Sequence, residues 1–311
     1  MFVEMAIGDA YGVRFEGCDA DYTARQNNLT YRPDPKILLE HPEDTMMTLV
    51  YPGRYTDDTQ MSLAIAEAML DDNEPWTKES LAERFVQVFR RDERRGYTTY
   101  FLNVLMNSTN GKEMLSRING KSTKSGAFMR AAPLGLYERF DMLLDRAQMQ
   151  AMVTHDSEAG KGSAIGAAMM VHYFYHDLGP KHELSGWMRD RYFGDTIMTP
   201  HPVDLDGEKV MCWSPRDKRR VRVHGWDCLH AAIYAVEESE TLSDVLKVCA
   251  TYGGDVDTVS AVAMAAASWS REIEQTIPRV LCEELENGKY GRGYLEDLDR
   301  RLVSKFPPLT P

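Results

Sequence analysis

Residues 56–70 read TDDTQMSLAIAEAML, and residues 255–267 read DVDTVSAVAMAAA. Each stretch opens with two carboxylates and a threonine, and each continues as a run of small and apolar residues that is typical of a buried helix. Small side chains allow helix axes to approach closely. We therefore expect both helices at the centre of an all-α protein, as parts of a compact orthogonal bundle, with their acidic starts close together.

Helical periodicity recurs along most of the chain. It predicts further helices over 78–91, 140–153, 163–175, 226–237, 242–251, 259–269, 273–284 and 294–303. The helix at 163–175 is also rich in small residues and belongs at the centre with the first two. Residues 219–224 are the best candidate for a strand in a small β-hairpin. Two polar segments, 19–55 and 186–224, are expected as loop excursions of one domain that spans residues 1–311.

Composition limits the class of protein. The 311 residues are 43% hydrophobic, which is enough for a sizeable core, and the net charge of -12 argues against general binding to nucleic acid or to an acidic membrane. That charge still leaves room for a local basic patch at Lys218, Arg219 and Arg220.

Five scattered cysteines without CxxC pairs suggest free thiols in a reducing compartment. No apolar run reaches the ~18 residues of a membrane span, and residues 1–6 lack a signal-peptide pattern. We expect a cytoplasmic monomer with no membrane partner.

The four carboxylates Asp57, Asp58, Asp255 and Asp257 have two interpretations. Aspartate and threonine are favoured at helix starts because they satisfy free N–H groups, so each cluster alone could be a helix cap. Two such clusters at the starts of two central helices favour a metal site instead. All-oxygen ligands point to Mg²⁺ or Mn²⁺, and there are enough of them for two ions.

Three further motifs are weaker. Residues 8–12, GDAYG, favour close helix packing, and Glu16 follows them. Residues 122–130, STKSGAFMR, form a hydroxyl-rich start of a helix, which could bind phosphate or could be only a capped helix start. A lone histidine such as His155 is more often structural than functional.

Together these motifs resemble the ADP-ribosylglycohydrolase family, which includes the dinitrogenase reductase-activating glycohydrolases. The resemblance runs from Gly8 to about Ala267. It depends on five elements in order: GDAYG at 8–12 with Glu16, YTDDT at 55–59, SGAFMR at 125–130 with PLG at 133–135, Thr154 with His155, and GGDVDT at 253–258. The second and fifth elements are specific, and their order makes a chance match improbable.

The resemblance implies an all-α fold with a centre of two Mg²⁺ or Mn²⁺ ions that hydrolyses the glycosidic bond between ADP-ribose and an acceptor. The residues it implies as metal ligands are Thr56, Asp57, Asp58, Asp255, Asp257 and Thr258. Catalytic roles fall to Glu16, Asp57 and Asp58: either aspartate could act as the base on water, and Glu16 could assist the leaving group. The implied substrate contacts are Ser122, Thr123, Lys124, Ser125, Gly126, His155, Gly225 and Trp226.

The chain also departs from the family pattern. Lys124, Ser125 and Gly126 replace the usual Gly-Asn-Gly, Thr123 replaces an aromatic residue that can stack on adenine, and 186–224 matches no family pattern. We expect reversal of ADP-ribosylation on a protein side chain, with arginine as the first candidate. Alternatives are a hydrolase of free ADP-ribose derivatives or of ADP-ribosylated nucleic acid, and a non-enzymatic ADP-ribose-binding relative. The expected partner is an ADP-ribosylated protein or an ADP-ribose derivative, with nucleic acid only as a modified substrate.

Overall fold

Helices make up nearly all the regular structure in the computed structural model, which describes residues 1–40, 52–72, 75–199 and 201–309. The first half of the chain contains α1 (Phe2–Gly12), α2 (Ala20–Gln26), α3 (Pro35–Glu40), α5 (Asp57–Leu70), α6 (Lys78–Arg91), α7 (Thr99–Met106), α8 (Gly111–Arg117) and α9 (Phe140–Ala151). The second half contains α10 (Glu158–Tyr175), α11 (Leu184–Met188), α12 (Gly225–Glu238), α13 (Leu242–Thr251), α14 (Val256–Ala267), α15 (Arg279–Glu284) and α16 (Arg292–Lys305). The predicted all-α fold is confirmed.

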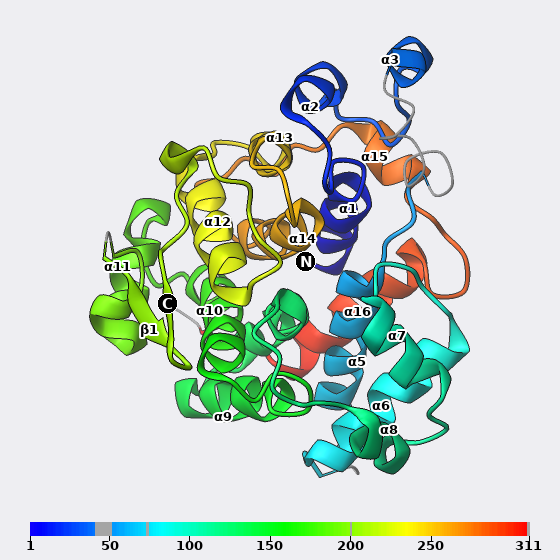
Figure 1. The fold of residues 1–311 in the computed structure, drawn as a ribbon, viewed down its shortest axis with the longest axis vertical. Coiled ribbons are helices and arrows are strands. Elements are labelled where there is room, and N and C mark those ends of the chain that lie inside the picture. Colours follow the sequence, from blue (N-terminus) through cyan, green and yellow to red (C-terminus); the bar gives the residue numbers. More distant parts are fainter. Residues whose placement is uncertain (41–51, 73–74, 200, 310–311) are drawn as a thin grey trace.

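Helix α14 is the centre of the molecule. It contacts α1, α5, α10, α12 and α13, and every one of its residues is buried (Figure 1). A helix that is built mostly of small and apolar residues is buried, and here other helices surround it. The predicted central position of the three helices rich in small residues is confirmed, because α14 contacts both α5 and α10.

The helix packed most extensively on α14 is α1, which periodicity did not single out. A Cβ atom added at Gly8 would lie 2.5 Å from the carbonyl oxygen of Ser260, and one added at Gly12 would lie 2.5 Å from Cα of Asp257. Only glycine fits at such distances, so the helix-packing interpretation of residues 8–12 is confirmed. The close approach also places Asp9 of α1 beside the start of α5.

Two predicted elements are wrong in position. The small hairpin is formed by β1 (Val203–Leu205) and β2 (Glu208–Val210), and residues 219–224 contribute only a single bridge between Val221 and Gly254. Asp206 and Gly207 both have positive φ angles, so the Asp-Gly turn between β1 and β2 was the decisive signal. The last predicted helix before α16 starts at Arg279 instead of residue 273, because the residue before Pro278 is biased away from helical angles.

The two expected loop excursions contain more structure than predicted. Residues 186–224 include the end of α11, a π-helical turn at Arg189–Phe193, the hairpin, and a 3-10 turn at Pro215–Asp217. In the first excursion α2 and α3 are helical, and residues 41–51 lie outside the described part. Helices α1, α7 and α8 were not predicted.

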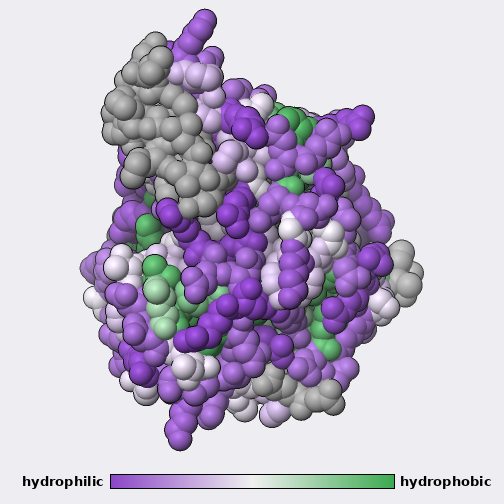
Figure 2. Space-filling model, turned by 90° about the vertical axis from the view of Figure 1, so that its right-hand side faces the viewer, coloured by the Kyte–Doolittle hydropathy of each residue, from purple (hydrophilic) through white to green (hydrophobic). Residues whose placement is uncertain are grey.

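One face of the molecule shows how polar and apolar side chains are distributed on the surface. The face at the right of Figure 1 is mostly hydrophilic, with hydrophobic side chains in small separate groups (Figure 2). Among the described residues, none of the helices combines the length and the apolar character that crossing a membrane requires.

Substitution of Gly8 by alanine tests the close packing of α1 on α14. We expect the free energy of unfolding to fall by about 1–3 kcal/mol, because the new methyl group would collide with backbone that cannot move freely. Urea denaturation measures the change. Gly288→Ala is the matched control, since a Cβ atom there would meet nothing within 4 Å. Equal stability of Gly8→Ala and the native protein would contradict the packing argument.

Candidate functional site

The buried carboxylate of Asp9 organises the start of α5. It accepts hydrogen bonds from the backbone N–H groups of Thr56, at 2.9 Å, and Thr59, at 3.0 Å, and from their hydroxyls, at 2.8 and 2.7 Å. These are the N–H groups that a capping box normally satisfies from within the same helix. Asp9 therefore caps α5 from another helix and leaves the acidic residues of α5 free for other contacts.

Helix capping does not account for the two acidic clusters. Thr56 and Asp255 occupy the N-cap positions of α5 and α14, but neither side chain makes the capping hydrogen bond. Instead, Oδ2 of Asp255 accepts from Ser125 Oγ at 2.7 Å and lies 3.3 Å from the Cys228 thiol. The side chains of Thr56 and Asp255 thus contact other segments, whereas Asp257 Oδ1 accepts the backbone N–H of Thr258 within α14 at 3.0 Å.

The two clusters meet in space, as predicted. Thr258 of the second cluster donates its hydroxyl proton to Oδ1 of Asp58 in the first, at 2.8 Å across 200 residues of sequence. Ser125 connects Asp255 to the hydroxyl-rich segment at 122–126. Three segments that are distant in the sequence therefore share one network of hydrogen bonds.

A cavity of about 650 Å³ opens over this network. Its walls include most of the predicted site residues, namely Glu16, Asp57, Asp58, Ser122, Lys124, Ser125, Gly126, His155, Asp255, Asp257 and Thr258. The remaining wall comes from the α7 region and its neighbours, with Thr98, Tyr100, Phe101, Ile118 and Asn119 among the lining residues. A space of this size, lined by both polar and apolar groups, suits a ligand of nucleotide size.

Four predicted site residues do not line this cavity. Thr56 bonds to Asp9, and Thr123 accepts the backbone N–H of Gly225 at 3.1 Å. Gly225 lies against Ser163, and the buried Trp226 packs against Gly162 and Phe193. Gly225 thus supports the 122–126 segment through Thr123 and Lys124, because the start of α12 packs there on α10.

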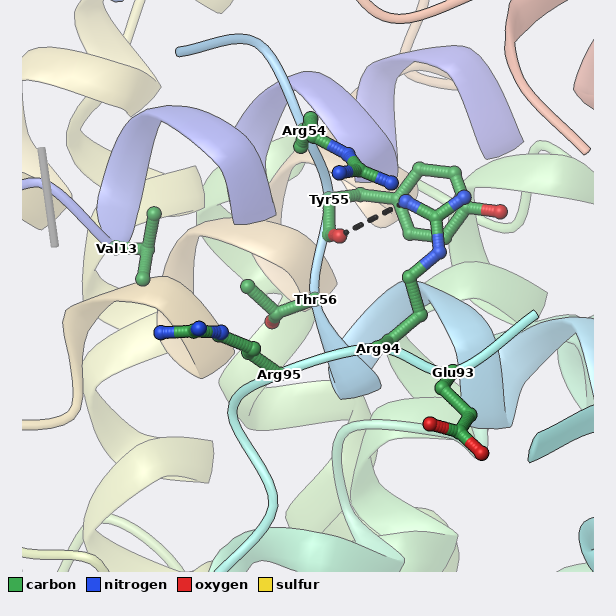
Figure 3. Close-up of a pocket in the computed structure, with 7 residues that line it drawn as sticks. All are labelled: Val13, Arg54, Tyr55, Thr56, Glu93, Arg94 and Arg95. Atoms are coloured by element: carbon green, nitrogen blue, oxygen red, sulfur yellow. Dashed lines mark hydrogen bonds between the residues drawn. The ribbon is translucent and has the colours of Figure 1, made fainter. Parts of the chain in front are cut away.

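Thr56 instead lines a second, smaller pocket of about 140 Å³ (Figure 3). Arg54, Arg94 and Arg95 line it together with Val13, Tyr55 and Glu93. The buried Arg94 donates to the carbonyl of Tyr55 at 3.3 Å and forms ion pairs with Asp92 and Glu286. This pocket thus holds none of the clustered carboxylates, and the larger cavity is the candidate active site.

Burial and mutual repulsion act on the carboxylates of the cavity. Burial raises the pKa of Asp57, Asp58 and Asp257 well above the usual range, and the neighbouring carboxylates raise it further. Glu16 is exposed at the mouth, yet its partial enclosure and the charges of Asp255 and Asp9 raise its pKa to about 7. Binding of protons or of cations to these carboxylates would remove the repulsion between them.

The donor set suits a hard divalent cation. Carboxylate and hydroxyl oxygens are the ligands that Mg²⁺ and Mn²⁺ prefer. In the described part of the chain, no three His, Cys, Asp or Glu side chains are already gathered closely enough to hold an ion. Asp58 and Asp255 instead accept hydrogen bonds from Thr258 and Ser125, and these carboxylates would have to exchange hydroxyl partners for a metal. The predicted ligands fit by chemistry, and their role stays a prediction.

A chain of buried donors orients His155. Arg130 donates to Thr154 Oγ1 at 2.8 Å, so the hydroxyl proton of Thr154 can go to Nδ1 of His155, 2.6 Å away. Burial, with Arg130 and Lys124 nearby, holds the pKa of His155 well below its usual range. The neutral ring then carries its proton on Nε2 and can donate it to a ligand. Gly126 makes room for this ring, because a Cβ atom there would lie 2.8 Å from Cε1.

Asp9, Arg130, Thr154 and Cys228 also contribute to the site, and the sequence pattern does not predict these roles. Asp9 lies inside the GDAYG motif, which indicates only close helix packing. Arg130 and Thr154 lie within motifs that carry the family resemblance, but no pattern indicates that they act through His155. No sequence signal could have linked Cys228 to Asp255, since the contact exists only because α12 packs beside α14.

Asp9→Asn tests the cross-helix cap. The amide keeps the shape but replaces one acceptor oxygen with a donor that faces other donors, so we expect a loss of about 1–3 kcal/mol in the free energy of unfolding. Urea denaturation measures it. Asp141→Asn, at an exposed carboxylate, is the control. An unchanged stability of Asp9→Asn would show that the cap contributes little.

The raised pKa values predict an unusual pH dependence. Between the ordinary pKa of about 4 in the unfolded chain and the higher folded values, the folded protein binds more protons, so its free energy of unfolding falls as the pH rises. We expect the chelator-treated protein to lose stability between pH 5 and pH 8. Asp257→Asn should lose less over the same range. Equal pH dependence in urea unfolding of the two proteins would contradict the assignment.

Comparisons with known proteins identify the family and the fold. The family model described as ADP-ribosylglycohydrolase matches residues 5–309. ADP-ribosylhydrolase ARH3 of Xenopus tropicalis is 28% identical over 303 residues, which cover 84% of this chain and 83% of that protein. ADP-ribosylarginine hydrolase Tri1 of Serratia proteamaculans is 23% identical over 270 residues, with 83% and 67% covered. A solved structure, the ADP-ribosylglycohydrolase-related protein complex, shares the fold with a TM-score of 0.57 at 19% identity and 98% coverage of both chains. The protein described here therefore belongs to the ADP-ribosylglycohydrolase family.

Proposed function

We propose that the protein is a divalent-metal-dependent hydrolase of the glycosidic bond between ADP-ribose and an acceptor side chain. One observation carries the proposal: the carboxylates of both acidic clusters line the same cavity as the 122–126 segment and His155. Cation-binding groups and phosphate-binding groups thus lie within one space of about 650 Å³. ADP-ribose needs both, because its diphosphate is anionic and its reacting ribose carries hydroxyls.

The metal would be held by the residues of the two clusters. Asp57, Asp58, Asp255 and Asp257 supply carboxylate oxygens, and the hydroxyls of Thr56 and Thr258 lie next to them. Two Mg²⁺ or Mn²⁺ ions, when bound, would neutralise the repelling carboxylates, orient the ribose hydroxyls and polarise a water. The metal ion is a proposal that the donor chemistry of these residues supports.

The diphosphate would fit the part of the cavity wall formed by the 122–126 segment, next to the carboxylates. No side chain caps the 3-10 turn η2 (Ser125–Ala127), so its first N–H groups remain for an anion. Lys124 adds a positive charge on the cavity wall, and Nε2 of His155 can donate one more hydrogen bond. These groups would hold the phosphates and leave the ribose at the carboxylates.

Glu16 would act as the general acid, and Asp57 or Asp58 would act as the general base. With a pKa near 7, Glu16 can carry a proton at neutral pH and donate it to the leaving acceptor. Asp57 or Asp58 would accept a proton from the attacking water. The negative charge around the anomeric carbon would favour the oxocarbenium-like transition state.

The acceptor is the open part of the proposal. The relatives that the chain resembles include proteins named ADP-ribosylhydrolase ARH3 and ADP-ribosylarginine hydrolase Tri1. An arginine acceptor is the first choice, and a serine or other side chain is the alternative. The 122–126 segment does not discriminate between them, because it would hold the diphosphate and not the acceptor.

Hydrolysis assays test the proposal. The protein would be incubated with arginine-, serine- and nucleobase-linked ADP-ribose, with Mg²⁺ or Mn²⁺ and then with a chelator. We expect free ADP-ribose from one of the amino-acid conjugates, only with metal, and a loss of at least about 100-fold in Asp257→Asn.

Asp141→Asn, which changes an exposed carboxylate outside the cavity, should retain full activity. Calorimetric titration with Mn²⁺ would separate loss of binding from loss of chemistry in Asp257→Asn. Release that persists in the chelator would refute the metal requirement, and no release from any conjugate would refute the hydrolase.

A further inference from the structure

A stretch of positive charge borders the acidic cavity. Residues 216–222 read RDKRRVR, and five of the seven are arginine or lysine in a chain whose net charge is -12. We refer to them as the basic segment. Building on the proposed hydrolase, we propose that the basic segment binds an acidic stretch of the polypeptide that carries the ADP-ribosylated residue.

The basic segment is fastened to the loop that opens α14. The backbone N–H of Val221 donates to the carbonyl of Gly253 at 2.9 Å, and the N–H of Asp255 donates to the carbonyl of Val221 at 3.1 Å. A Cβ atom at Gly254 would lie only 1.9 Å from the Val221 oxygen, so this contact requires glycine there. The basic segment therefore has a fixed position beside a cavity carboxylate.

The other side of the basic segment reaches the loop that carries Glu16. Arg220 donates to the carbonyl of Gly17 at 3.0 Å, and the N–H of Gly17 donates to Gly254 at 3.4 Å. Two residues beyond Val221, Val223 is 46% exposed and lines the cavity. The basic segment thus lies on the rim between Glu16 and Asp255. An acceptor chain that leaves the cavity on this side would pass over it.

Only part of the positive charge is neutralised within the protein. Arg222 forms two hydrogen bonds to the buried Asp227, at 2.8 and 3.0 Å, and Glu208 lies near it. Arg219 lies 3.6 Å from Asp217. Arg216, Lys218 and Arg220 are exposed and form no ion pair with any described residue. These three side chains remain to attract a negatively charged partner.

The backbone holds two of these charges in place. Ser214 caps the 3-10 turn η7 (Pro215–Asp217) by accepting the N–H of Arg216, and Lys218 follows in the left-handed conformation. A preorganised turn reduces the entropy lost when a partner binds. The cavity itself is acidic, so acidic residues of a partner would stay at the rim and the ADP-ribose would enter alone.

A polypeptide fits this surface better than a nucleic acid. Single-stranded nucleic acid is usually bound by aromatic rings on which the bases stack. The ring near the basic segment, Trp213, is buried against Tyr252, and the exposed apolar neighbours are Met211 and Val223. The large negative charge of the whole protein would also repel a long polyanion.

Paired substrates test the proposal. The same ADP-ribosylated residue would be placed in a peptide with acidic neighbours, in one with neutral neighbours, and in the free amino acid. For the double variant Arg216→Glu/Lys218→Glu, we expect the KM for the acidic peptide to rise roughly fivefold to tenfold. Hydrolysis of the free amino-acid conjugate, which does not reach the basic segment, should change less than twofold. The preference of the native protein for the acidic peptide should weaken as salt is added.

Arg300→Glu/Arg301→Glu is the matched control, because it reverses two exposed charges on α16 and leaves the rim intact. Equal KM values for acidic and neutral peptides with the native protein would overturn the proposal. So would an equal loss on the amino-acid conjugate, which would mean that the variant disturbs the loop of Asp255. A segment-dependent preference for an ADP-ribosylated oligonucleotide over the acidic peptide would likewise overturn it.

Binding separates this proposal from the proposed function. Fluorescence anisotropy of the labelled acidic peptide reports on the basic segment whether or not the bond is cleaved. Absence of hydrolysis with intact, segment-dependent binding would refute the hydrolase and leave the acidic partner supported. Hydrolysis of the amino-acid conjugate, with equal binding of the acidic and neutral peptides, would support the hydrolase and refute the acidic partner.

Discussion

The contact between α1 and α14 determines where everything else in the site can lie. Two glycines allow the helices to touch through their backbones, and this contact carries Asp9 to the first turn of α5. There it satisfies N–H groups that a side chain of α5 would otherwise have to cap. Asp57 and Asp58 at the start of α5 are therefore not needed as helix caps. Asp9 does not line the cavity itself, but by capping α5 it allows Asp57 and Asp58 to face the cavity.

Gathering these carboxylates around one cavity reduces the stability of the folded protein. Several carboxylates whose pKa is raised by burial and by one another lie around one space, which opposes folding at neutral pH unless protons or cations are bound. Proteins commonly concentrate such conflicts at functional sites. The many buried alanines and glycines of the central helices supply the compact scaffold that tolerates this conflict.

The sequence predicted the central helices more accurately than it predicted the hairpin and the walls of the pocket. The amino-acid composition and the helical periodicity identified α5, α10 and α14. A helix that other elements cover on all sides is built mostly of small and apolar residues. The Thr258 to Asp58 contact followed from placing their helices together. Trp226 and Gly225 were assigned to the pocket wall by resemblance, but their packing against Phe193 and Ser163 depends on tertiary contacts that no local pattern encodes. The hairpin was misplaced for a different reason: its Asp206-Gly207 turn was overlooked.

Ser125 gives the site one more property. Its hydroxyl joins the 3-10 turn η2 to the same oxygen of Asp255 that the thiol of Cys228 approaches. A ligand that moves this turn would therefore also change the hydrogen-bond partners of Asp255. Linkage is reciprocal, so any free energy that couples ligand binding at the turn to ligand binding at Asp255 acts equally in both directions. The Ser125 hydroxyl is thus a direct physical connection through which binding at one part of the cavity can influence binding at the other.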